Sequence, residues 1–231
     1  MSVIPFILSG GNRTIVERKQ EYQDEGGLDG NVILIQNFDR DQIIDPNSSN
    51  ASYDLRVGDE YRDHRESGKT DLLDNQKICL QAGSAVIIET AESVQFPKSR
   101  FGHIVPKVSL LQDGLSNTSS KIDPGYNGKL LVTVFNLGKR TVFLKKGQKF
   151  CTLYVLDIQN GVTPYNKVAK RIAGSSRVSP LRRAIDSIER GQALIACLAL
   201  IVSIITGLAQ IVEHIQKQEV KTQMPQKVKT Y

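Results

Sequence analysis

The chain has no tryptophan, and aromatic residues make up only 6% of it. Its net charge is +6, but the basic residues do not form one block, and no stripe of basic and aromatic side chains interleaves along the sequence. Proteins that bind nucleic acids usually gather such residues on one surface. The composition therefore argues against a nucleic acid partner. It favours a triphosphate or an anionic membrane surface as the source of negative charge.

Cysteine is also scarce, and its spacing excludes two kinds of site. Cys79, Cys151 and Cys197 are far apart and form no Cys-x-x-Cys pair. Neither a zinc ribbon nor a redox-active pair is expected. The His-x-Glu and Pro-Cys-x-x-Cys motifs of zinc-dependent deaminases are absent as well. We expect all three cysteines to be buried small apolar residues in a reducing compartment.

The first residues, MSVIPFIL, do not have the features of a signal peptide. They carry no charged leading region and no long apolar core. We therefore expect the N-terminal part of the chain to lie in the cytoplasm.

Strand and turn patterns dominate residues 105–158. Apolar or alternating strands are expected at 129–135, 140–144 and 150–156, separated by turns at 123–125, 136–139 and 145–147. Earlier strands are expected at 4–8, 32–35, 53–57, 77–80, 85–90 and 101–105, and residues 12–23 suit a short helix or a loop. Short strands at this spacing predict an all-β barrel or sandwich.

Several motifs in this region resemble one enzyme superfamily. The run IDPGYNG at 122–128, ASYDLRVGDEY at 51–61 and VSL at 108–110 are similar to motifs of the dCTP deaminases and the trimeric dUTPases, in family order. The resemblance covers roughly residues 30–160. It implies a distorted β-barrel (β-clip) over residues 1–160 and a homotrimer with nucleotide sites between subunits.

Asp123 is the candidate catalytic residue. A carboxylate at a tight turn can orient and deprotonate a water molecule aimed at a phosphate. By resemblance, this position holds the water-activating aspartate of dUTPases. The alternative is that Asp123 only begins an Asp-Pro-Gly turn.

The resemblance also implies a set of residues that bind a pyrimidine dNTP, either dUTP or dCTP, with Mg²⁺ carried by the triphosphate. Tyr126 would pack under the deoxyribose, and two glycines would let the backbone approach the base. Two lysines stand where the families place arginines. The set consists of Asp54, Lys107, Ser109, Lys121, Gly125, Tyr126 and Gly128, with Tyr165 and Lys170 in a lid-like segment, 161–179.

Departures from the motifs are equally informative. Thr133 stands where the deaminases have their catalytic glutamate, and Val108 and Gln112 replace two other site groups, so deamination is expected to be lost. The dUTPase pattern is incomplete too, because Thr152 replaces a glutamine and the glycine-rich C-terminal arm is absent. Three functions stay open. They are a dNTP hydrolase that most closely fits dUTP, a non-catalytic dNTP sensor with a regulatory or antiviral role, and the disfavoured deaminase.

The C-terminal part has a different character. Ser179-Pro180 suits the start of an amphipathic helix at 180–192. Residues 193–212 carry no charge, which predicts a transmembrane helix that anchors a cytoplasmic β domain. A basic polar tail, 213–231, follows. The alternative is a helix buried on a trimer axis.

Overall fold

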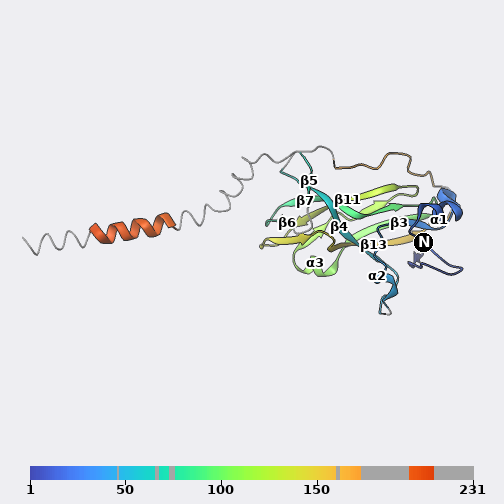
Figure 1. Cartoon of the computed structure of the whole chain (residues 1–231), viewed down its shortest axis with the longest axis horizontal. Coiled ribbons are helices and arrows are strands. Elements are labelled where there is room, and N and C mark those ends of the chain that lie inside the picture. Colours follow the sequence, from blue (N-terminus) through green and yellow to red (C-terminus); the bar gives the residue numbers. More distant parts are fainter. Residues whose placement is uncertain (46, 66–67, 73–75, 160–161, 173–197, 211–231) are drawn as a thin grey trace, which may run out of the picture. The chain divides into compact units, whose positions relative to one another are not determined.

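The computed structural model describes residues 1–45, 47–65, 68–72, 76–159, 162–172 and 198–210 (Figure 1). The chain divides into two units, Met1–Arg177 and Val178–Tyr231. The first unit, which we call the β domain, is built mainly of strands. The prediction of a mostly β fold for this part is confirmed.

The β domain contains short helices and thirteen strands among its described residues. The helices are α1 (Lys19–Asp24), the 3-10 turn η1 (Gly27–Asp29), α2 (Asp41–Ile44) and α3 (Val108–Gln112). The strands are β1 (Val3–Ile4), β2 (Ile15–Val16), β3 (Ile33–Gln36), β4 (Tyr53–Asp63), β5 (Thr70–Asp71), β6 (Lys77–Leu80), β7 (Ala85–Gln95), β8 (Arg100–Pro106), β9 (Leu115–Asn117), β10 (Ser120–Ile122), β11 (Asn127–Asn136), β12 (Val142–Lys145) and β13 (Lys149–Asp157).

The main sheet runs in the order β10-β8-β13-β4-β7-β11-β9. Its pairings are antiparallel, and β2 and β3 add a parallel pair at the side of β7. β6 and β12 form a separate two-stranded sheet. Alternate residues of the long strands point inward, so Leu55, Ile88, Val132 and Leu153 are fully buried in one core.

Several predictions for single elements need correction. β1 ends at Ile4 instead of reaching residue 8, because Pro5 has no backbone N–H to donate to a ladder. The helix expected within 12–23 forms only at α1, and Ile15–Val16 is a strand. Cys151 is buried as expected, but Cys79 is only half-buried, since its side chain lies on the outer face of β6. Cys197 lies outside the described residues.

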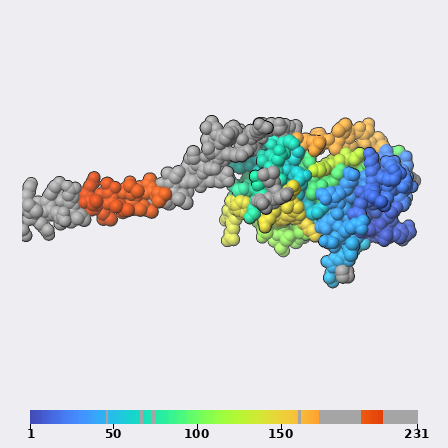
Figure 2. Space-filling view, in the orientation of Figure 1, coloured from blue at the N-terminus to red at the C-terminus, as the bar shows by residue number. Residues whose placement is uncertain are grey.

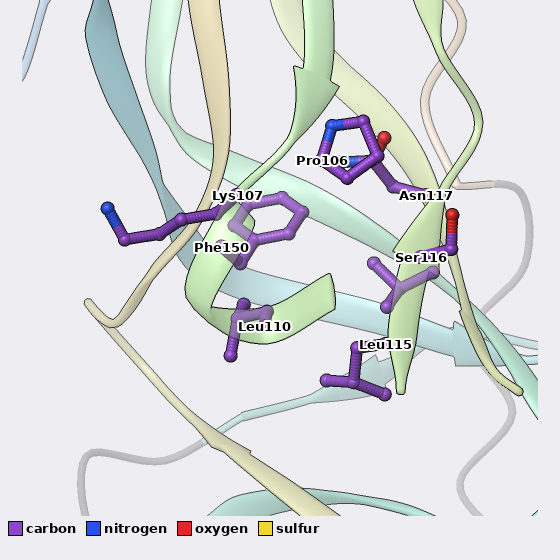
Figure 3. Close-up of a pocket in the computed structure, with 8 residues that line it drawn as sticks. Pro106, Lys107, Leu110, Leu115, Ser116, Asn117 and Phe150 are labelled. Carbon is purple, nitrogen blue, oxygen red and sulfur yellow. The ribbon is translucent and has the colours of Figure 1, made fainter. Parts of the chain in front are cut away.

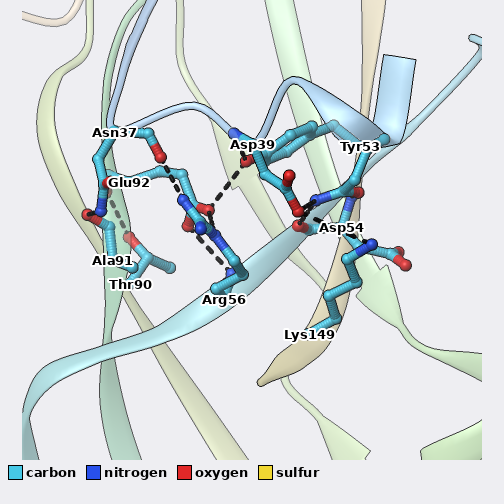
Figure 4. Close-up of polar contacts among 10 residues, drawn as sticks. Asn37, Asp39, Tyr53, Asp54, Arg56, Thr90, Ala91, Glu92 and Lys149 are labelled. Atoms are coloured by element: carbon cyan, nitrogen blue, oxygen red, sulfur yellow. Dashed lines mark hydrogen bonds and ion pairs between the residues drawn. The ribbon is translucent and has the colours of Figure 1, made fainter. Parts of the chain in front are cut away.

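A buried ionic network fixes β4 against β7 (Figure 4). The Glu92 carboxylate is fully buried and accepts hydrogen bonds from Tyr53 Oη at 2.9 Å, Arg56 N at 3.0 Å and Arg56 Nε at 2.7 Å. Both carboxylate oxygens are therefore hydrogen-bonded, as a buried charge requires. The hydroxyl of Tyr53 also accepts a hydrogen bond from Asp39 N at 2.9 Å, which ties the preceding loop to the same network.

Residues 198–210 of the second unit form a helix with mostly exposed apolar side chains. The helix predicted at 180–192, the tail 213–231 and the ends of the apolar run 193–212 lie outside the described residues. Within the part of the chain that is described, no helix combines the length and the apolar character needed to cross a membrane.

Candidate functional site

Asp123 lies in a tight turn between β10 and β11. Tyr126 N donates to Asp123 O at 3.1 Å, and Gly125 has φ +80°, a conformation that glycine adopts without strain. The Asp123 side chain is about one-third exposed, and Lys121 Nζ lies 2.8 Å from its Oδ1. The turn therefore presents a carboxylate and a cation together at the surface.

Tyr126 follows in the same turn and packs against Tyr165. The ring centroids are 5.5 Å apart with an interplanar angle of 49°. Tyr126 Oη donates to the backbone carbonyl of Lys129 at 2.6 Å. Burial raises the pKa of Tyr126 to about 12, and the charges of Tyr165 and Glu89 act in the same direction. The phenol is thus a neutral hydrogen-bond donor over the physiological pH range.

Residues 162–172, which we call the strap, lie across this turn. Tyr165 N donates to Pro124 O at 2.7 Å. The contact is close enough that a Cβ added at Gly125 would lie 2.9 Å from Pro164 Cβ, and one added at Gly128 would lie 2.5 Å from Ala169 Cβ. Both glycines are therefore needed for the strap to approach the hairpin.

The turn, the strap and the neighbouring strands enclose an open cavity of about 480 Å³. This volume is within the usual range for small-molecule sites. The walls combine apolar side chains with two lysines, two tyrosines and a serine. The lining residues are Ile104, Ser120, Lys121, Ile122, Tyr126, Leu130, Leu131, Tyr165 and Lys170.

Glu89 on β7 is a residue that the sequence reading missed. Its side chain is 1% exposed, and neither carboxylate oxygen accepts a hydrogen bond from the described residues. It is held by charge instead, because Lys129 Nζ lies 3.1 Å from Oε1 and Arg171 Nε of the strap lies 3.9 Å from Oε2. Nothing in the sequence pointed to Glu89, because a polar residue is ordinary on the outward face of a strand. The strap that covers it is distant in the chain.

A second group of predicted site residues surrounds Asp54 on β4. Asp54 Oδ1 accepts a hydrogen bond from Thr152 Oγ1 at 2.7 Å, and Oδ2 is ion-paired with Lys107 Nζ. Gln42 holds the strand in place, since Asp54 N donates to its Oε1 at 2.8 Å and its Nε2 donates to Asp54 O at 2.9 Å. Ser109 lies close by in sequence, on α3, and is exposed.

Beside Lys107 there is a small internal cavity between α3, β9 and β13 (Figure 3). Its volume is about 10 Å³, which is enough for one water molecule and too small for a nucleotide. Asn117 is among its lining residues, and its Oδ1 has no hydrogen-bond partner among the described residues. The cavity is therefore suited to a single bound water.

The two groups of predicted residues do not meet within one chain. Ile122, before Asp123, is paired with Gly102 near the start of β8, whereas Lys107 follows the other end of that strand. Five residues of extended chain separate these points, which is about 16 Å. Asp123, Lys121, Tyr126, Tyr165 and Lys170 form one group, and Asp54, Lys107 and Thr152 form the other.

No three Asp, Glu, His or Cys side chains of the described residues lie close enough together to hold a metal ion. Mg²⁺ generally binds proteins through one or two carboxylates, and water and substrate phosphates complete its octahedral shell. Asp123 is about one-third exposed and can serve in that way, whereas Asp54 is 19% exposed and would first have to release Lys107. The residues present thus fit an ion that arrives with a triphosphate.

Comparison with known proteins shows which family the chain belongs to. A sequence profile described as dCTP deaminase-like matches residues 18–157, which is more than half of the chain. The chain belongs to this family. The dCTP deaminase of Pyrococcus horikoshii is 29% identical over 147 residues, covering 63% of this chain and 88% of the relative.

Solved structures of both branches of the superfamily are also similar. The dCTP deaminase of Agrobacterium tumefaciens has a TM-score of 0.44 at 20% identity, covering 52% of this chain and 43% of the other. The native equine infectious anaemia virus (EIAV) dUTPase has a TM-score of 0.35 at 28% identity, covering 51% of this chain and 98% of the other. A dUTPase mutant from phage phi11 of Staphylococcus aureus, with a TM-score of 0.41 at 17% identity, was described with a structural Mg(II) ion; the match covers 62% of this chain and 100% of that one.

The expectation that deamination is lost depends on Thr133. That residue lies on β11, and its register partner on β7 is Ile87. Neither side chain can transfer a proton at neutral pH. The acidic residue of β7 that lies nearest to Ile87 along the strand is Glu89, opposite Leu131. Its carboxylate is already paired with Lys129 and Arg171.

Proposed function

We propose that this protein hydrolyses a pyrimidine deoxynucleoside triphosphate, most closely fitting dUTP, to the monophosphate and diphosphate. The observation that carries the proposal is the cavity next to Asp123. Its two lysines, Lys121 and Lys170, suit phosphate oxygens, and the tilted pair of rings of Tyr126 and Tyr165 suits a sugar or base. Family membership supports a nucleotide as the ligand.

In this proposal Asp123 accepts a proton from the water that attacks a phosphorus atom. Lys121, which is ion-paired with Asp123, would turn to the phosphate when the ligand binds. Tyr126 is fixed by its hydrogen bond to Lys129 O, so its ring presents a rigid face to the deoxyribose. When bound, Mg²⁺ would neutralise phosphate charge, with Asp54 or Asp123 as its protein ligand.

We further propose a homotrimer in which the site is completed between subunits. The group at Asp123 and the group at Asp54 lie about 16 Å apart along β8. Neither group alone offers a carboxylate base, a sugar platform and enough cations for three phosphates. A trimer would bring the Asp54 group of one subunit to the Asp123 group of its neighbour.

A second candidate function is dNTP sensing without turnover. It is favoured by Thr133 and Thr152, which stand where the family motifs have a glutamate and a glutamine. It is also favoured by the Lys107–Asp54 ion pair, because that pairing engages an ammonium that could otherwise bind phosphate. Ligand binding would then change the state of the C-terminal part of the chain. In either case we propose that residues 193–212 anchor the protein in a membrane with the β domain in the cytoplasm, because the run contains no charge.

The experiment is to incubate the full-length protein with each dNTP and Mg²⁺, and to follow diphosphate release and the identity of the base. Diphosphate release from dUTP supports the hydrolase. Tight binding without turnover supports the sensor. Conversion of dCTP to dUTP would contradict both, because it would require a proton-transferring group near Thr133. Retention of the protein in membranes after alkaline carbonate treatment tests the anchor.

A further inference from the structure

The two-stranded sheet β6–β12 carries an unusual pair of like charges. Lys145 and Lys77 are directly opposite each other in its register, as are Phe143 and Cys79. Side chains that are opposite in an antiparallel pair point to the same face, with Cβ atoms roughly 4.5–5.5 Å apart. Like charges at this distance destabilise a sheet. The repulsion between Lys77 and Lys145 therefore lowers the stability of the sheet, and a bound anion would remove it.

The inner and outer faces of this sheet differ sharply. Ile78, Leu80 and Leu144 are fully buried in the core of the β domain. Lys77 and Lys145 on the opposite face are exposed, and Phe143, in the next row of the same face opposite Cys79, is 53% exposed. A large aromatic ring is thus held in solvent beside two ammonium groups. We call Lys77, Phe143 and Lys145 the basic face.

Among the described residues, no acidic side chain balances the charge of the basic face; Asp74, three positions before Lys77 in the sequence, lies outside them. Residues 136–153 contain five lysines and arginines and no acidic residue, and 76–88 contain no acidic residue either. Two of the five are neutralised, because Lys146 lies 2.8 Å from Asp59 and Lys149 lies 3.8 Å from Asp39. Lys77 and Lys145 have no ion pair with any described residue, and neither do Lys139 and Arg140, which lead into β12. In Figure 1 this sheet lies at one end of the β domain, where β6 is labelled; Figure 2 shows the same end in space-filling form.

We propose that the basic face binds the surface of an anionic lipid bilayer. A pair of lysines next to an exposed aromatic ring matches the chemistry of that surface, since the ammonium groups would meet lipid phosphates while the ring enters the boundary between head groups and acyl chains. Single-stranded nucleic acid is less well matched. It is usually bound by a series of aromatic rings along a basic groove, and the basic face has one ring. The membrane anchor proposed above for residues 193–212 would also supply a bilayer as the partner, and in this respect the inference rests on that proposal. This inference does not depend on nucleotide hydrolysis.

The absence of tryptophan allows a local test. Phe143→Trp gives the full-length protein a single tryptophan in the basic face, and Val3→Trp, at a position 50% exposed on β1, is the matched control. Each variant is mixed with vesicles of phosphatidylcholine alone or of phosphatidylcholine with phosphatidylserine. We expect the emission of Trp at 143 to move to shorter wavelength only with phosphatidylserine, and that of the control to stay unchanged. Because the probe is local, this readout is separate from any binding through residues 193–212.

The charge requirement is tested by adding Lys77→Gln and Lys145→Gln to the Phe143→Trp variant. Each lysine near an anionic surface contributes about a 5-fold change in affinity, so the double change should weaken the response roughly 30-fold. Three results would overturn the proposal. They are no shift with phosphatidylserine, an equal shift with phosphatidylcholine alone, and quenching by an oligonucleotide in place of a response to vesicles. The last would assign the basic face to nucleic acid.

Discussion

The ammonium of Lys129 lies 3.1 Å from a carboxylate oxygen of the buried Glu89. The same ammonium lies 3.7 Å from Asp59, which is itself 2.8 Å from Lys146. Hydrogen bonding to Lys146 holds the pKa of Asp59 below its usual value. Glu89 is thus the buried end of a chain of charges that reaches the surface, and Arg171 connects the strap to that end.

Glu89→Gln should release the strap. The amide keeps the shape of the side chain but removes the charge that attracts Arg171 and Lys129. We expect trypsin to cleave after Lys167 and Lys170 several-fold faster than in the wild type, as mapped by mass spectrometry. Glu17→Gln, which breaks the ion pair with Arg40 elsewhere in the β domain, is the control and should leave this cleavage unchanged. Equal cleavage in both variants would mean that the strap is held without Glu89.

Asp123→Asn should remove most of any dNTP hydrolysis and leave nucleotide binding largely intact. The amide fills the same space but cannot accept a proton from water. A loss of the order of 10²-fold or more in kcat with a similar Kd is expected. Steady-state kinetics and calorimetric binding of a non-hydrolysable analogue would measure the two effects. Unchanged turnover would reduce Asp123 to a turn residue.

Gly128→Ala should displace the strap from the hairpin. The new methyl group would lie 2.5 Å from Ala169 Cβ, and the φ of +147° is unfavourable for alanine. Gly147→Ala is a matched control, because its φ of +74° is also positive but no atom lies within 4 Å of the new methyl group. Both variants should lose about 1–3 kcal/mol from backbone strain. Only Gly128→Ala should increase trypsin cleavage in the strap, and the prediction fails if Gly147→Ala does the same.

Glu92→Ala should destabilise the β domain by about 3–5 kcal/mol, because it leaves the partly buried Arg56 and the buried Tyr53 hydroxyl without their partner. Urea unfolding followed by circular dichroism would measure the loss. Glu17→Gln again serves for comparison, since an exposed ion pair contributes only about 0–1 kcal/mol. A loss as small as in that control would show that water replaces the carboxylate.

Tyr126→Phe should change the alkaline stability of the protein. The pKa of Tyr126 is raised from 10.0 to about 12 in the folded state. A raised pKa contributes stability that is fully present below about pH 10 and is lost as the pH rises through 12. The difference in free energy of unfolding between wild type and variant should therefore be constant below pH 10 and shrink above it. Tyr22, whose pKa is also raised to about 12, is present in both proteins and cancels.

The sequence alone determined the family and most of the strands. The IDPGYNG run and its turn residues are local signals, because a turn depends on the few residues within it. For the same reason, β6 was predicted at its observed bounds and the centres of β8, β11 and β13 were located correctly, whereas only the first halves of β4 and β7 were predicted. The ends of β1 and α1 were predicted wrongly. A single proline ends β1, and the sequence pattern around α1 is too weak to set its bounds.

Only the tertiary structure decided which residues share a site. The distance between Asp123 and Lys107 depends on the register of β10 against β8, and the basic face depends on the register of β12 against β6. Glu89 meets Arg171 because the strap returns across β7 and β11, although 82 positions separate them in the chain. Such contacts arise from burial and pairing over the whole domain, so no short stretch of sequence contains them.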